Sequence, residues 1–282
     1  MKQIIMCNTY KGVNITKYGV KVEKPNSIQV LKNNIDVLKD AKVIEEKIVL
    51  NDRKDSMYTL VKTCEELAKE VSKLEKPIII GGDHSIALGS IKGVAKQNDG
   101  PDEKLGIIWI DSHGDFNTGD TTPTGNIHGM PLSALAGLGY SELVNVYKKG
   151  QAILPRNIVI LGTRDLDDEE EVLLNENGVK FYPYNEVVER GLDKVLKEIN
   201  EYLQVERLHI SFDLDSMDPE IIKGVCIPVK AGFNEADIYQ IFDYFNANKN
   251  ICSIDIVEYN SDNDDGHTLE FIKSLLQTKL NY

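Results

Sequence analysis

Residues 106–115 read Gly-Ile-Ile-Trp-Ile-Asp-Ser-His-Gly-Asp, an apolar run that stops at an acidic turn containing a histidine. A continuous apolar run bounded by a turn is typical of a strand buried on both faces, as a parallel sheet requires. Further runs of the same form end in turns elsewhere in the chain. They span residues 77–81, 157–162, 207–212 and 251–257. The sequence therefore predicts a parallel sheet that contains these five strands.

Helical patterns separate the apolar runs. Between residues 56 and 74, apolar side chains recur at intervals of three or four, and Pro77 follows the end of the pattern. Less regular helical patterns cover residues 85–97, 131–148, 166–177, 186–203 and 234–248. Strands that alternate with helices predict an α/β fold with a doubly wound sheet. In such sheets, ligands bind outside the carboxyl ends of the strands.

The composition excludes several classes of protein. The chain has 282 residues, with 45 acidic against 32 basic side chains and a net charge of −13. We therefore expect no nucleic-acid partner, which would need a basic face, and no membrane partner, which would need a basic or amphipathic anchor. Apolar residues make up 41% of the chain, enough for a core, and the length allows a single domain over residues 1–282.

The cysteines and the N-terminus indicate a cytoplasmic protein. The four cysteines are scattered and form no CxxC pair, so neither a disulfide framework nor a thiolate metal site is expected. The N-terminal residues lack the apolar core of a signal peptide, and no apolar run reaches the roughly 18 residues of a membrane span.

Acidic and histidine side chains follow the predicted strands. After Ile110 they alternate, and alternate residues of an extended segment point the same way. Taken singly, each could merely cap a turn, but as a set their oxygen and imidazole donors suit a divalent ion such as Mn²⁺. The set exceeds what one catalytic ion needs and fits two ions that share carboxylates. Its members are His84, Asp111, His113, Asp115, Asp213 and Asp215.

Three motifs, in this order and spacing, resemble the metal motifs of the arginase (ureohydrolase) family. They are GGDHS at 81–85, DSHGDFN at 111–117 and SFDLDSMDP at 211–219. The resemblance covers about residues 77–260 and implies a three-layer α/β/α sandwich around a mostly parallel sheet. It makes the six residues above the ligands of a binuclear centre with two Mn²⁺ ions as cofactors. It also implies hydrolysis of L-arginine to L-ornithine and urea by a hydroxide that bridges the two ions.

The resemblance further assigns substrate-binding residues. The loop that continues from Asp115 is similar to that of arginases rather than of agmatinase-like relatives. It implies that Asn117, Thr122 and Thr124 help to bind the α-carboxylate of the substrate. Neutral donors suit this task, since a cation there would repel the guanidinium. Asp167 matches the position that recognises the α-amino group.

Catalytic roles are implied for three residues. His128 matches a histidine proposed as a proton shuttle, a role that suits an imidazole because its pKa is near neutral. Glu258 matches the glutamate that pairs with the guanidinium, and a carboxylate can accept two parallel hydrogen bonds from that group. Asp115, as a ligand with a spare oxygen, is expected to pass a proton to the leaving amine.

Two segments depart from the family pattern. Residues 224–228 read Gly-Val-Cys-Ile-Pro where relatives have a GTGTP-like turn, and residues 259–261 replace the usual Asn-Pro. Other ureohydrolase activities therefore remain as alternatives, namely agmatinase, guanidinobutyrase or formimidoylglutamase. A binding protein that no longer catalyses is a further alternative.

The remaining expectations concern the partners and three further features of the chain. Family resemblance implies a small-molecule substrate, L-arginine, and a homo-oligomer, either a trimer or a hexamer. The acidic run at 168–171 is expected to be a solvated helix N-terminus, which the helix dipole favours. Trp109 and His209 lie within predicted strands and are expected to be core residues.

Overall fold

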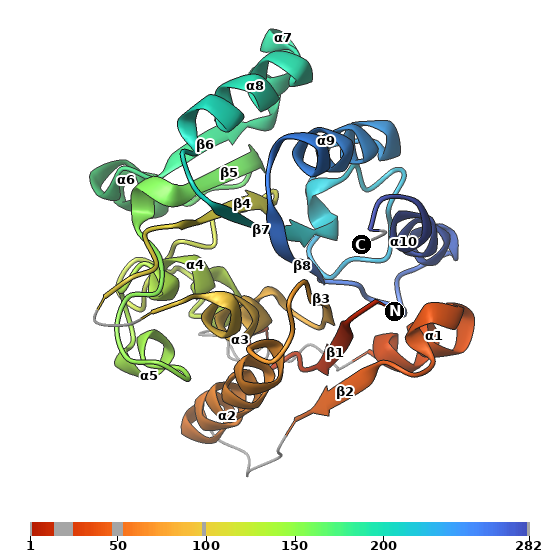
Figure 1. Cartoon of the computed structure of the whole chain (residues 1–282), viewed down its shortest axis with the longest axis horizontal. Helices are drawn as coiled ribbons and strands as arrows, with labels where there is room; N and C mark the ends of the chain where they lie inside the picture. Colours follow the sequence, from red (N-terminus) through yellow and green to blue (C-terminus); the bar gives the residue numbers. More distant parts are fainter. Residues whose placement is uncertain (1, 14–24, 47–52, 98–99, 281–282) are drawn as a thin grey trace.

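The computed structural model describes residues 2–13, 25–46, 53–97 and 100–280 (Figure 1). Within this part of the chain, eight strands form one sheet. They are β1 (Ile4–Asn8), β2 (Lys42–Glu45), β3 (Ile78–Gly81), β4 (Leu105–Ile110), β5 (Ile158–Thr163), β6 (Lys180–Pro183), β7 (Arg207–Asp213) and β8 (Ile251–Val257). Their order is β2-β1-β3-β8-β7-β4-β5-β6, and every neighbouring pair is parallel.

Helices cover both faces of the sheet, as Figure 1 shows. One face carries α1 (Ser27–Asn34), α7 (Tyr184–Arg190), α8 (Leu192–Tyr202), α9 (Glu235–Asn248) and α10 (His267–Thr278). The other carries α2 (Arg53–Val71), α3 (Ala87–Val94), α4 (Pro131–Leu135), α5 (Ser141–Val144) and α6 (Asp168–Asn177). Along β4, Ile108 and Ile110 pack into the first layer, whereas Ile107 and Trp109 pack into the second. The predicted α/β/α sandwich with a doubly wound parallel sheet is confirmed.

All five predicted strands are present, as β3, β4, β5, β7 and β8. The prediction missed β2 and β6 because they lie at the two edges of the sheet. There they are short and partly exposed, so they lack a continuous apolar run. It also missed β1, which is buried but ends in no acidic turn.

Two predicted helices are each broken in two. The pattern at 131–148 forms α4 and α5, and Gly137, with φ of 90°, lies between them. The pattern at 186–203 forms α7 and α8, which meet at Gly191, with φ of 85°. A left-handed backbone ends a helix and is readily adopted only by glycine, so side-chain periodicity alone overestimated the length of both helices.

The sheet order brings four turns to one edge. Strands β3, β8, β7 and β4 are consecutive neighbours in the sheet, although the chain reaches them far apart in sequence. Because all four are parallel, the turns after Gly81, Ile110, Asp213 and Val257 leave at the same edge.

No helix in the described part of the chain is long and apolar enough to span a bilayer.

A buried lysine links the helical layer on the second face. Lys92 of α3 is 0% exposed, and its Nζ donates hydrogen bonds to the carbonyls of Val144 (2.8 Å), Lys148 (2.9 Å) and Gly150 (2.6 Å). The ammonium therefore ties the loop after α5 to α3. Three carbonyls share one donor group, so its removal leaves all of them without this partner.

We expect Lys92→Met to lower the free energy of unfolding by about 3 kcal/mol, because hydrogen bonds from a buried charged donor are lost and the carbonyls stay desolvated. Urea denaturation of the purified variant measures this change. Lys149→Met, at an exposed position of the same loop, is the matched control. A change below about 0.5 kcal/mol for Lys92→Met, as is usual for surface substitutions, would contradict the expectation.

Candidate metal centre and substrate pocket

A pocket of about 190 Å³ opens beside the carboxyl ends of the central strands. Every predicted site residue lines it except Asp111, which is fully buried. The structure therefore brings these side chains together at one edge of the sheet. The roles assigned to them are a separate question, which depends on their geometry.

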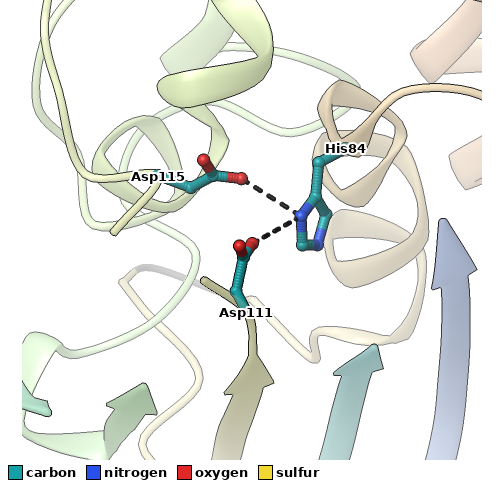
Figure 2. A group of neighbouring side chains, drawn as sticks. All are labelled: His84, Asp111 and Asp115. Atoms are coloured by element: carbon teal, nitrogen blue, oxygen red, sulfur yellow. Dashed lines mark ion pairs between the residues drawn. The ribbon is translucent and has the colours of Figure 1, made fainter. Parts of the chain in front are cut away.

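The first group of possible ligands surrounds one imidazole nitrogen. His84 Nδ1 lies 2.9 Å from Asp111 Oδ2, 3.1 Å from Asp115 Oδ2 and 3.0 Å from Asp213 Oδ2. Figure 2 shows Asp111 and Asp115 pointing toward this nitrogen from the end of β4 and the loop that follows it. Although it is so close to three carboxylates, Nδ1 is buried without a hydrogen-bond partner, because no bond of good geometry joins them.

The second group lies beside the first and shares one residue with it. His113 Nδ1 is 3.1 Å from Asp215 Oδ2 and 3.4 Å from Asp111 Oδ1. Ligand atoms of His84, Asp111 and Asp115 lie within 4.8 Å of one another, and so do those of Asp111, His113 and Asp215. Asp111 belongs to both groups, so it offers one carboxylate oxygen to each of two neighbouring ion positions.

This arrangement fits divalent cations. An octahedral ion with ligand distances near 2.1 Å separates neighbouring ligand atoms by about 3 Å, which matches the spacing around His84 Nδ1. The donors are carboxylate oxygens and imidazole nitrogens, a set that suits Mn²⁺. The orphaned Nδ1 adds a buried polar atom that a cation would satisfy.

The pKa shifts of the possible ligands also favour a bound cation. Burial opposes charge on His84, but the carboxylates of Asp111, Asp115 and Asp213 raise its pKa well above the usual value. Burial also raises the pKa of Asp115 to about 6 and that of Asp213 well above its usual range. Buried carboxylates crowded in this way bind protons when no cation neutralises them.

Aromatic and hydroxyl side chains hold the first ligand in place. The indole of Trp109 stacks on His84, with ring centroids 3.9 Å apart and an interplanar angle of 7°. Its Nε1 donates to Asp111 Oδ2 at 2.9 Å, and Ser211 Oγ is 2.8 Å from His84 Nε2. Trp109 is a core residue, as expected, but it also orients two possible ligands, in the way that outer-shell groups orient metal-binding histidines. His209 is likewise buried.

The two catalytic candidates beside the metal groups are in contact. Glu258 Oε1 accepts a hydrogen bond from the His84 backbone N–H at 2.9 Å and lies 3.1 Å from His128 Nδ1. Its other oxygen, Oε2, is buried and has no hydrogen-bond partner. Glu258 has φ of 64° and Asp115 has φ of 49°. Left-handed backbone at a residue other than glycine costs about 1–3 kcal/mol and often marks a functional site.

Further polar side chains line the pocket. Asn117 Nδ2 donates to Asp167 Oδ2 at 2.8 Å, and Thr121 Oγ1 donates to Asn117 Oδ1 at 2.8 Å. The hydroxyl oxygens of Thr122 and Thr124 lie 3.5 Å apart. Thr121, which the sequence prediction missed, therefore fixes which side of the Asn117 amide faces Asp167.

The expectation for the acidic run at 168–171 is wrong at one position. Glu170 is only 3% exposed, lines the pocket and accepts the Phe116 backbone N–H at 2.8 Å through Oε1. Burial raises the pKa of this carboxyl to about 8. The helical spacing offered a signal, because Glu170 lies one turn before the buried Leu174 and shares its face of α6.

Comparison with known proteins agrees with this geometry. The family model described as the arginase family matches residues 15–280. An arginase from Bacillus subtilis (strain 168) is 38% identical over 279 residues, which cover 95% of this chain and 92% of that protein.

Solved structures of arginases resemble the whole chain. The arginase from Bacillus caldovelox has a TM-score of 0.83 at 29% identity and covers 100% of this chain and 99% of its own. The Entamoeba histolytica arginase in complex with L-ornithine has a TM-score of 0.86 at 27% identity, with 100% of both chains covered. The family match over nearly the whole sequence, together with the 38% identical relative, places this chain in the arginase family.

Proposed function

We propose that this chain is a binuclear manganese hydrolase that converts L-arginine and water to L-ornithine and urea. One observation carries the proposal. Residues of both metal-ligand groups and Glu258, with its unpartnered Oε2, line the same pocket. The solved Entamoeba histolytica relative is in complex with L-ornithine, which is the product that the proposal assigns to this chain.

The metal ligands in this proposal are the six side chains at the strand ends. The first ion is assigned to His84, Asp111, Asp115 and Asp213, and the second to His113, Asp111 and Asp215. When bound, Mn²⁺ would supply the Lewis acidity that activates water near neutral pH. Ordinary turn capping does not account for an imidazole nitrogen surrounded by three carboxylates without a hydrogen bond.

The guanidinium end of the substrate is assigned to Glu258. Its Oε1 is already engaged by His84 N–H, whereas Oε2 is available to accept a guanidinium N–H. A charge-assisted bond of this kind orients the planar group as well as attracting it. His128 lies 3.1 Å from Oε1 and lines the pocket, and it is assigned the exchange of protons with solvent.

The amino-acid end of the substrate is assigned to the polar side chains around Asn117. Thr122 and Thr124 offer hydroxyl donors to the α-carboxylate. Asn117 also lines the pocket and donates a hydrogen bond to Asp167. The Asp167 carboxylate is assigned to the α-amino group. Asp115 is assigned the transfer of a proton to the leaving amine. A single catalytic domain over residues 1–282, a trimer or hexamer, and a cytoplasmic location remain predictions.

Removal of metal by a chelator should abolish urea release, and addition of Mn²⁺ should restore it. We expect two manganese ions per chain, because two ligand groups share Asp111. Elemental analysis and a urea assay on the same samples measure both quantities. Asp215→Ala should lose about one ion per chain, while Asp120→Asn, at an exposed position of the substrate loop, should lose none. Full activity in metal-free protein would contradict the proposal.

Asp115→Asn should keep measurable manganese but lower kcat by at least about a hundredfold, since general acid–base groups contribute 10²–10⁴. His128→Asn should lower kcat by less, because solvent can partly replace a proton shuttle. Steady-state kinetics with arginine, alongside metal content, tests both assignments. Unchanged activity of Asp115→Asn with manganese bound would exclude its role, and equal losses in the two variants would argue against a shuttle at His128.

The wild-type chain should prefer arginine to agmatine, because donors placed for a carboxylate stay unpaired when agmatine binds. Thr124→Val should lower kcat/KM for arginine by about tenfold, the effect of one lost hydrogen bond, and leave agmatine unaffected. Thr278→Val, in the distant α10, is the matched control. Parallel assays with arginine, agmatine, guanidinobutyrate and formimidoylglutamate measure the preference. A higher rate with any of the last three would identify a different ureohydrolase.

A further inference from the structure

Residues near the N-terminus form hydrogen bonds with the segments that carry the catalytic candidates. Residues 9–13, which we call the strap, follow β1 and pass over the turn after β3. Asp83 N–H donates to Thr9 O at 3.1 Å, and Asp83 Oδ2 accepts the backbone N–H groups of Gly12 (2.7 Å) and Val13 (3.2 Å). The strap is therefore bonded to the turn that carries His84.

The strap also forms hydrogen bonds with the segments that carry His128 and Glu258. Gly12 O accepts the backbone N–H of Ile127 at 2.9 Å, directly before His128. The buried Tyr10 hydroxyl donates to the carbonyl of Tyr259 at 2.6 Å, directly after Glu258. No side chain fits at Gly12, where an added Cβ would lie 2.9 Å from His128 N.

Glu258 needs such support because its backbone is strained. With φ of 64°, it persists only if hydrogen bonds hold the chain before and after it. Its own N–H donates to Gly82 O at 2.8 Å, and the carbonyl of the following residue, Tyr259, accepts the Tyr10 hydroxyl. Tyr10 thus holds the peptide group between Tyr259 and Asn260, one residue beyond Glu258.

The two segments that depart from the family pattern complete the support on the opposite side. Val225 and Tyr259 form an antiparallel bridge, and Asn260 N–H donates to Gly224 O at 2.8 Å. The Asn260 side chain also donates to Cys226 Sγ at 3.5 Å. The altered segments at 224–228 and 259–261 are therefore bonded to one another. The Tyr259 carbonyl is bonded instead to the Tyr10 hydroxyl.

We propose that Tyr10 is a positioning residue that, through its bond to the Tyr259 carbonyl, holds Glu258 in the left-handed conformation from which its carboxylate faces the substrate. This inference rests on the proposed function, because it takes Glu258 as the guanidinium-binding residue. Tyr10 itself does not line the pocket. Its hydroxyl acts on the reaction only by setting where the Glu258 carboxylate lies.

Tyr10→Phe removes this one hydroxyl and keeps the ring. We expect kcat/KM for arginine to fall about tenfold, the effect of one buried hydrogen bond. Most of the loss should be in kcat, because orientation of the guanidinium is disturbed. Manganese content should not change. Tyr239→Phe, which removes a hydroxyl bonded to Ser274 between α9 and α10, is the matched control and should keep full activity.

A double-mutant cycle separates positioning from a general structural role. In a Glu258→Gln background, Tyr10→Phe should cause no further loss, because the residue through which it acts is already altered. A merely structural defect would lower the residual rate of Glu258→Gln by the same factor as in the wild type, and that result would overturn the proposal.

A crystal structure of Tyr10→Phe tests the proposal independently of turnover. We expect residue 258 to leave the left-handed region, or its carboxylate to leave the His84 N–H. An unmoved Glu258 would overturn the proposal. The wild-type assays identify failure of the proposed function separately. If the wild-type chain hydrolyses another guanidine or amidine, the double-mutant cycle is measured with that substrate. If it hydrolyses none, the crystal structure of Tyr10→Phe tests whether Tyr10 positions Glu258.

Discussion

Buried negative charge is the constraint on which the rest of this structure depends. Carboxylates from the end of β7 and from the segments after β4 and β7 crowd around two imidazoles where water has little access. Such a cluster is unfavourable unless cations neutralise it. The parallel sheet makes it possible, because four neighbouring strands end at one edge. Close packing of helices on both faces then keeps the strand ends from separating to relieve the repulsion.

Strain is concentrated at the same edge. Asp115 and Glu258 both have left-handed backbone, and both belong to the pocket. The bonds that hold the segment around Glu258 come from distant parts of the chain: the strap at residues 9–13, the turn after β3, and the turn at 224–226. Glu258 is thus held by a network that includes the strap, which precedes the residues matched by the family model.

The central strands were predictable because burial on both faces leaves a continuous apolar run. The edge strands β2 and β6 were not, since partial exposure breaks that run. Ligand residues could be predicted because alternation within a turn is a local property, visible in Asp111, His113 and Asp115. Glu170 was assigned to solvent, because four consecutive acids give little indication of which one the helix turns inward.

By itself, the sequence determined the fold class and the chemical identity of the candidate metal ligands, because apolar runs and alternating donors are encoded by neighbours in the chain. Its motifs also carried the family resemblance. Only the tertiary structure decided which groups lack a partner, such as Glu258 Oε2, and which residues support the site, such as Trp109, Thr121 and Tyr10. The physical reason is distance along the chain. Tyr10 and Tyr259 are separated by 249 residues, and only the packing of strands that are distant in sequence brings them within a hydrogen bond.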